Sequence, residues 1–178
     1  MMKFFLTAVL AAMLLVFPAG CGTDAASKTE PGFTEDDLFL VTDGRQLRCA
    51  VNIEEVIAVF GGGYEYSEAV SCLYEGLDKS FIYDIAEFYT YPANGGDYVN
   101  EIYTSSPEVT ASRGIRAGST RDDVTAAYGQ PAEDTGNLFI YELAVVIDSH
   151  QSATLSFLFD GNDTVTALWL AINRGAVE

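Results

Sequence analysis

The chain has 178 residues, of which 49% are apolar, and its formal net charge is −17 at neutral pH. This length allows one domain or two small ones, and the apolar content is ample for a packed core. The charge argues against nucleic acid and anionic membrane surfaces as partners, because both attract basic patches. The nine lysines and arginines are instead scattered along the chain.

The first twenty residues differ in composition from the rest of the chain. Lys3 precedes an uncharged apolar run from Phe4 to Phe17, which is too short to span a bilayer and is typical of a secretory signal peptide. The segment Pro18-Ala19-Gly20-Cys21 resembles the lipobox of bacterial lipoproteins, although proline stands where that box has an aliphatic residue. The resemblance implies that Cys21 becomes the first mature residue and carries a diacylglycerol, which would anchor the protein to the extracytoplasmic face of the cell membrane.

The stretch after the lipid anchor is small, polar and acidic. Residues 21–37 contain Pro31-Gly32 and end in Glu35-Asp36-Asp37, a composition that favours a solvated linker. We therefore expect a signal peptide at 1–20 and a flexible tether at 21–37.

The two remaining cysteines form an even pair in a protein that we expect to be exported. Cys49 and Cys72 therefore favour a disulfide, and the alternative is a pair of buried free thiols. The sequence does not favour a nucleophilic cysteine, because the only histidine, His150, lies far away in the chain.

Two short helices are predicted from similar capping signals. The first runs from Asn52 to Gly61 and the second from Thr120 to Gly129, each opening on a polar N-cap residue and closing on a glycine that suits the left-handed C-terminal position. Pro131 prevents the second helix from continuing.

Strand-like sequence surrounds both helices. A hairpin with its turn at Asp43-Gly44 is expected before the first helix. The strands and turns expected after the helices are Phe81 to Tyr91, a turn at Asn94-Gly95-Gly96-Asp97 and Tyr98 to Tyr103, then Leu138 to Ile147, Ala153 to Phe159, a turn at Asp160-Gly161-Asn162-Asp163 and Thr164 to Ile172. The pattern predicts an α+β fold of two tandem helix-then-antiparallel-sheet repeats, at 38–106 and 107–178.

The second helical segment resembles a known family. The run from Gly114 to Val124, closed by Tyr128-Gly129-Gln130-Pro131, is similar to the helical signature of the SmpA/BamE-type outer-membrane assembly lipoproteins. A doubled unit of this kind also resembles the tandem fold of β-lactamase inhibitor protein. The resemblance implies a fold rather than a role, because this chain departs from the assembly lipoproteins in its expected duplication, its expected disulfide and its acidity.

No catalytic residue, metal site or cofactor is predicted. Ser149-His150 is an adjacent pair whose side chains would point apart on a strand. Gly61-Gly62-Gly63 follows a helix instead of opening one, so it lacks the helix N-terminus that binds phosphate. The turn from Asp160 to Asp163 offers oxygen ligands but lacks the spacing and the glutamate of a calcium loop, which favours an ordinary hairpin turn.

Tyrosines are concentrated in one part of the chain, with eight of the ten between Tyr64 and Tyr103. If Phe81 to Tyr91 is one strand, Tyr83, Tyr89 and Tyr91 share a face, which either packs between the repeats or meets a partner. We take these three tyrosines as the candidate binding face of a membrane-anchored, non-enzymatic module that binds an envelope or extracellular protein. The alternative is a cell-envelope enzyme that uses carboxylates in a cleft between the repeats.

Overall fold

The computed structural model describes residues 32–147 and 150–174, and 49% of these residues lie in strands and 14% in helices. The helices are the 3-10 turn η1 (Glu35–Asp37), α1 (Ile53–Phe60) and α2 (Arg121–Tyr128). The strands are β1 (Leu40–Thr42), β2 (Arg45–Leu47), β3 (Glu65–Val70), β4 (Leu77–Ile82), β5 (Glu87–Ala93), β6 (Gly96–Thr104), β7 (Thr110–Ala111), β8 (Glu133–Asp134), β9 (Leu138–Ile147), β10 (His150–Phe159) and β11 (Val165–Arg174).

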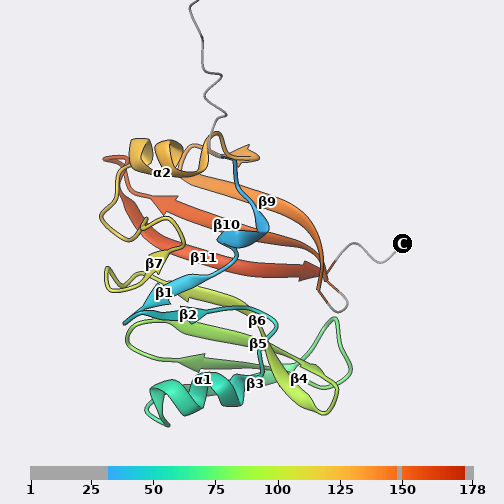
Figure 1. Cartoon of the computed structure of the whole chain (residues 1–178). Helices are drawn as coiled ribbons and strands as arrows, with labels where there is room; N and C mark the ends of the chain where they lie inside the picture. Colours follow the sequence, from blue (N-terminus) through green and yellow to red (C-terminus); the bar gives the residue numbers. More distant parts are fainter. Residues whose placement is uncertain (1–31, 148–149, 175–178) are drawn as a thin grey trace, which may run out of the picture.

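One large antiparallel sheet organises the molecule (Figure 1). Its eight strands follow the order β3-β4-β5-β6-β11-β10-β9-β8, and a small three-stranded sheet has the order β2-β1-β7. The small sheet and the two α-helices contribute side chains to the same core cluster as the large sheet, so all three lie on one of its faces.

The predicted fold class, two tandem α+β repeats, is wrong. The chain is mostly β, and its strands form one continuous eight-stranded sheet in place of two separate helix-then-sheet units. The junction is the pair β6 and β11, where Ile102 lies opposite Leu170. Pairing these strands satisfies backbone N–H and C=O groups that two separate sheets would each leave at an exposed edge.

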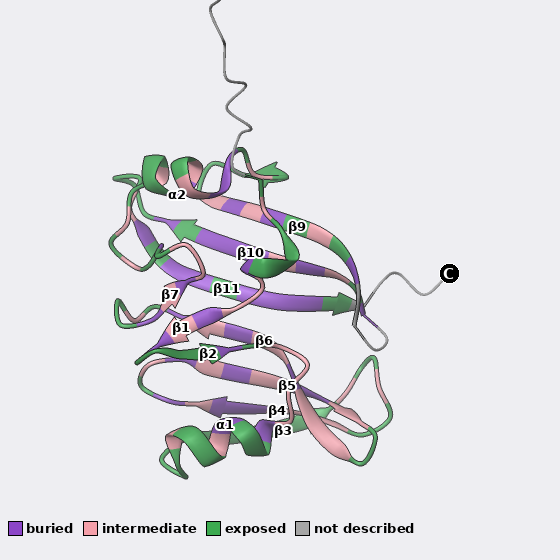
Figure 2. Ribbon diagram, in the orientation of Figure 1, coloured by how far each residue is buried: buried purple, intermediate pink, exposed green. Residues whose placement is uncertain are grey.

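The covered face of the large sheet carries the core. Residues that pair directly across strands point to the same side, so the register defines the rows on each face. One buried row on the covered face consists of Phe81, Phe88, Ile102, Leu170, Leu155 and Tyr141. Val56 of α1 and Val124 of α2 pack into the same cluster. Figure 2 shows buried stretches along β10, β11 and β4 of the large sheet. Burying each large side chain of this row contributes roughly 1.5–3 kcal/mol.

Both predicted α-helices are present, with their predicted caps. The Asn52 side chain accepts a hydrogen bond from the Glu54 backbone N–H, and Thr120 forms a capping box with Asp123. Gly61 and Gly129 follow the last turns with φ of 81° and 79°, a region that glycine enters without a steric cost. With eight residues each, neither helix of the described part is long enough to cross a bilayer.

Each helix end is tied to the sheet by one tyrosine hydroxyl. Tyr83 Oη donates to the carbonyl oxygen of Gly61 at 2.9 Å, and Tyr141 Oη donates to that of Gly129, also at 2.9 Å. These bonds satisfy carbonyl groups at helix C-termini that have no partner within the helix.

The tight turns follow the sequence in two places and depart from it in a third. Asp43-Gly44 and Asn94-Gly95 both adopt positive φ at two successive residues and close the β1–β2 and β5–β6 hairpins, as predicted. The predicted single strand from Phe81 to Tyr91 is wrong. The chain reverses between Tyr83 and Ala86, whose backbone groups are hydrogen-bonded at 3.0 Å, so β4 and β5 pair with each other.

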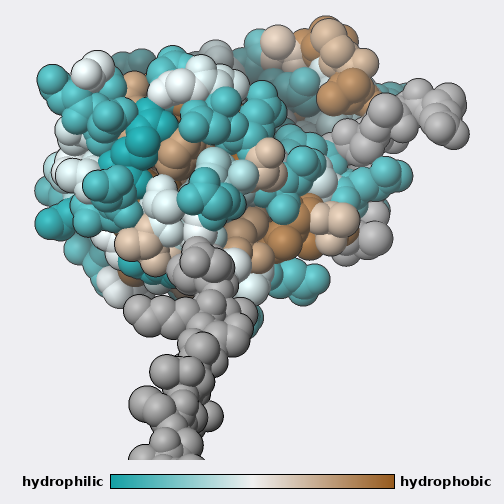
Figure 3. Space-filling view, turned by 90° about the horizontal axis from the view of Figure 1, so that it is seen from above, coloured by the Kyte–Doolittle hydropathy of each residue, from teal (hydrophilic) through white to brown (hydrophobic). Residues whose placement is uncertain are grey.

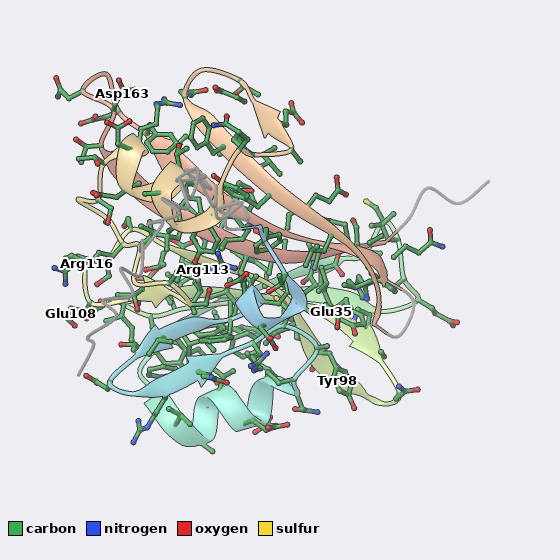
Figure 4. All side chains as sticks on the ribbon, turned by 45° about the horizontal axis from the view of Figure 1, so that its top comes forward. Glu35, Tyr98, Glu108, Arg113, Arg116 and Asp163 are labelled. Atoms are coloured by element: carbon green, nitrogen blue, oxygen red, sulfur yellow. The ribbon has the colours of Figure 1, made fainter. Side chains whose placement is uncertain are left out.

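The end of the predicted tether belongs to the folded domain. The Phe33 ring packs on Tyr128 and Tyr141. Asp37 is buried and accepts two hydrogen bonds from Arg113, which is labelled in Figure 4. The predicted flexible tether at 21–37 is therefore wrong for its last residues, because the Phe33 ring and the Asp37–Arg113 ion pair hold them on the core. The signal peptide at 1–20 and Cys21 lie outside the described residues.

Candidate binding surface

The three tyrosines of the predicted binding face do not lie together. Tyr83 and Tyr91 are only 9% and 1% exposed, so the prediction is wrong for both. Tyr83 packs against Phe60 and Phe88 in the main core, and Tyr91 lies in a second cluster against His150. The reversal between β4 and β5 separates Tyr83 from the other two tyrosines. A register shift between Tyr89 and Thr90 then breaks the alternation that the prediction assumed between Tyr89 and Tyr91.

The two cysteines are free thiols in the structure, so the predicted disulfide between Cys49 and Cys72 is not formed in it. The Cys49 thiol is half-buried and donates to the carbonyl oxygens of Asn100 and Leu170, at 3.4 and 3.7 Å. Cys72 is exposed on the turn between β3 and β4. Burial, aided by the charge of Glu101, raises the pKa of the Cys49 thiol, which disfavours its thiolate and hence its reactivity.

Tyr89 belongs to the open face, which we define as the face of the large sheet that points away from α1 and α2. Cross-strand pairing places Glu87, Tyr103 and Trp169 in one row of this face. The adjacent row contains Tyr89 opposite Glu101. None of these residues belongs to either core cluster, and Trp169 is 44% exposed. We call these five residues the Glu101 cluster.

Direct contacts hold the Glu101 cluster together. Tyr89 Oη donates to Glu87 Oε2 at 2.5 Å, and the Trp169 side chain is hydrogen-bonded to Glu101. The Tyr103 and Trp169 rings meet edge to face, with centroids 6.1 Å apart and an angle of 89° between their planes. The side chains of the cluster stand on neighbouring, hydrogen-bonded β-strands. The surface therefore has a fixed shape before a partner binds.

The cluster has shifted proton affinities with identifiable causes. The hydrogen bond to Glu87, followed by burial, raises the pKa of Tyr89 to about 12. Burial raises the pKa of the Glu101 carboxyl, the hydrogen bond from Trp169 opposes this, and the charge of Glu87 adds to it. Perturbed carboxyl groups of this kind are more frequent at functional sites than elsewhere.

Two hollows meet at Glu101. One, of about 270 Å³, is lined by Glu101 and Trp169 and by residues of β9 and β10 that include Ile140 and Thr154. The other, of about 330 Å³, is lined by Tyr89, Glu101 and Asn100 and by parts of β3 and β4. Asn100 Oδ1 is buried and accepts no hydrogen bond from the described part of the chain. Such an unsatisfied acceptor is uncommon in folded proteins and calls for an explanation.

The other residues considered from the sequence do not join this surface. His150 is buried, with Nε2 3.0 Å from Tyr74 Oη, and Ser149 lies outside the described residues. Asp160 Oδ1 accepts hydrogen bonds from the backbone of Asn162 and Thr164, as in the predicted hairpin turn. Within the described ranges, no three histidine, cysteine or acidic residues gather as a metal site.

The remaining surface offers a contrast to the Glu101 cluster. Figure 3, which looks down on the α2 end of the molecule, shows mostly hydrophilic side chains with hydrophobic ones in limited patches. At this end lies Asp163, which is labelled in Figure 4. Arg121 donates to Asp163 at 2.7 Å and lies over the rings of Phe139 and Phe159, so the arginine and both rings are already paired within the chain.

The sequence prediction missed four members of the cluster, namely Glu87, Glu101, Tyr103 and Trp169. The strands that carry Tyr103 and Trp169 were predicted correctly in outline, so the period-two alternation in them was a usable signal. The alternation does not show that β6 pairs with β11, and only this pairing places the two side chains next to each other.

Comparisons with protein families, with curated proteins and with solved structures find no match to this chain. The resemblance to the SmpA/BamE-type lipoproteins and to β-lactamase inhibitor protein therefore stays a prediction.

Proposed function

We propose that this protein is a non-enzymatic binding module, held on the extracytoplasmic face of the cell membrane by a lipid on Cys21, and that the Glu101 cluster is its contact surface for another protein. The observation that carries the proposal is the presence of Tyr103 and Trp169 side by side on a sheet face that the described chain leaves uncovered. Tyrosine and tryptophan are the residues most enriched at the energetic centres of protein interfaces.

The surroundings of these rings support the same function. Polar and acidic side chains border the aromatic pair, which is the usual arrangement of an apolar centre with a polar rim. Glu87 and Glu101 lie on one broad face beside these rings. The alternative, a cell-envelope enzyme, would use two carboxylates that face each other across a cleft. The raised pKa of Glu101 is the observation in its favour.

Affinity capture with chemical cross-linking tests the binding role. Full-length protein carrying Trp169→Ala and Tyr103→Ala should lose the envelope protein that the unmodified chain recovers. Val59→Ala is the matched control, because Val59 on α1 is 43% exposed against 44% for Trp169. Recovery of the same partner by all three proteins would contradict the proposal, as would the failure to recover any partner.

Metabolic labelling tests the anchor separately. Palmitate should label the unmodified protein and not the Cys21→Ser variant, because two acyl chains on one cysteine are expected to hold it at the membrane. Equal labelling of both proteins would remove the anchor from the proposal and leave the binding surface untouched.

A further inference from the structure

We propose that the Glu101 cluster recognises an arginine on a basic segment of the partner protein, with the guanidinium seated beside Glu101 and against the rings of Tyr103 and Trp169. This inference rests on the proposed binding function and specifies the chemistry of its partner.

The first argument is charge. The charged residues in the two cross-strand rows of the open face are all acidic, namely Glu65, Glu87, Glu101, Glu133 and Glu142. The ion pairs within the described part of the chain involve Asp37, Asp97, Asp134 and Asp163, and neither Glu87 nor Glu101 takes part in one. The cluster thus presents carboxylates without an internal cation, while the whole chain carries a net charge of −17.

The second argument is shape and chemistry. A guanidinium is planar, stacks on aromatic rings and donates several hydrogen bonds to a carboxylate at once. The register places the Glu101 carboxylate diagonally from the Tyr103–Trp169 pair, within the spacing at which long side chains on a sheet reach each other. The chain already binds its own Arg121 against two rings and two carboxylates, those of Asp163 and Asp134, so the same chemistry has an internal precedent.

The third argument is the buried acceptor Asn100 Oδ1. Asn100 lines the hollow that Glu101 and Tyr89 also line, and its buried Oδ1 has no donor among the described residues. A donor-rich group bound in this hollow would satisfy the acceptor once the Asn100 side chain turns towards it, and arginine carries five N–H donors. Burial also makes the ionised form of Glu101 costly, as its raised pKa indicates, and a cation beside the carboxylate offsets that cost.

The fluorescence of Trp169, which is the chain's only tryptophan, reports on this site directly. Capped hexa-arginine, titrated into the full-length protein in a non-ionic detergent, should give a saturable change in that fluorescence. Glu101→Gln should weaken the binding roughly tenfold, as expected for one partner of a partly desolvated charge pair. Glu54→Gln removes the same charge from the exposed start of α1 and should stay within about twofold of the unmodified protein.

Three results would overturn the inference. They are the absence of a saturable change, an equal loss in the two glutamine variants, or equal binding of capped hexa-serine. An envelope partner that Trp169→Ala removes, but that Glu101→Gln and hexa-arginine leave in place, would reject the arginine and preserve the binding function. Saturable, Glu101-dependent binding of hexa-arginine without any captured partner would preserve the arginine site and reject the protein-binding function.

Discussion

The two faces of the large sheet are built from alternate residues of the same strands, yet they carry different chemistry. In β5, Phe88 is fully buried under α1, while its neighbour Tyr89 points to the open face beside Glu87 and Glu101. In β11, Leu170 and Trp169 differ in the same way. Aromatic side chains therefore stabilise the fold on one face and are available for recognition on the other, and position within the alternation decides which role each one has.

Truncating one ring from each face gives the largest expected effect. Phe88→Ala should destabilise the fold by about 3–5 kcal/mol, because it leaves a cavity in the covered row. Tyr89→Ala should cost less than about 1 kcal/mol, since its ring lies in neither core cluster. Urea unfolding of both variants measures the difference, and comparable losses would show that the open face is also part of the core.

The next largest loss of stability should follow from breaking the ion pair between Asp37 and Arg113. Asp37→Asn should destabilise by roughly 2 kcal/mol, because Arg113 loses its buried carboxylate partner, whereas Asp36→Asn on the exposed side of the same turn should have little effect.

The loss at Asp37 should depend on pH with a definite sign. Burial acts to raise the pKa of this carboxyl, but hydrogen bonds from Arg113, Ser112 and Thr34 outweigh it and hold the pKa below the ordinary 3.8. The stabilisation is therefore complete above pH 3.8 and disappears as the pH falls through the lowered pKa. Thermal melts of both proteins across this window measure it, and a constant difference would contradict the assignment.

Removing either tyrosine hydroxyl that donates to a helix C-terminus should reduce the stability of the fold by a similar, intermediate amount. Tyr83→Phe and Tyr141→Phe should each cost about 1 kcal/mol, because each leaves a glycine carbonyl without its donor. Tyr89→Phe, which loses only a hydroxyl on the open face, is the control and should be close to neutral. Denaturant midpoints compare the three variants, and an unequal loss between the two helices would show that one end has another donor.

The smallest effect should be a gain in stability. Glu101→Gln should stabilise the fold by at most about 1 kcal/mol at neutral pH, because the raised pKa means that ionisation of Glu101 opposes folding. The gain is complete above the raised pKa and vanishes below the ordinary value of 4.5, where the carboxyl is protonated in both states. Thermal melts at neutral and acidic pH test this, and a loss at neutral pH would assign Glu101 to the fold instead of to binding.

The local signals in the sequence predicted local structure well. Asn52 and Thr120 cap their helices, and the Asp43-Gly44 and Asn94-Gly95 turns close their hairpins, because these conformations depend on residues that are adjacent in the chain. The reversal after Tyr83 was missed, since Asp84, Ile85 and Ala86 contain neither glycine nor proline and continue the alternation of the strand.

The non-local structure was beyond these signals. Nothing in β6 or β11 alone shows that they pair, and this pairing both makes the sheet continuous and assembles the Glu101 cluster. Tyr83 and Tyr91 illustrate the same limit, because α1 and the strands near His150 decide their burial, and those contacts join distant parts of the chain.

The two edge strands of the large sheet affect how copies of this protein associate with one another. β3 is exposed along its whole length and carries Glu65 and Glu68, and the opposite border is β8, which consists only of Glu133 and Asp134. Two molecules that approach border to border thus bring carboxylates against carboxylates, which discourages their strands from joining into a longer intermolecular sheet. The acidity of the chain in this way limits self-association and keeps crowded molecules separate.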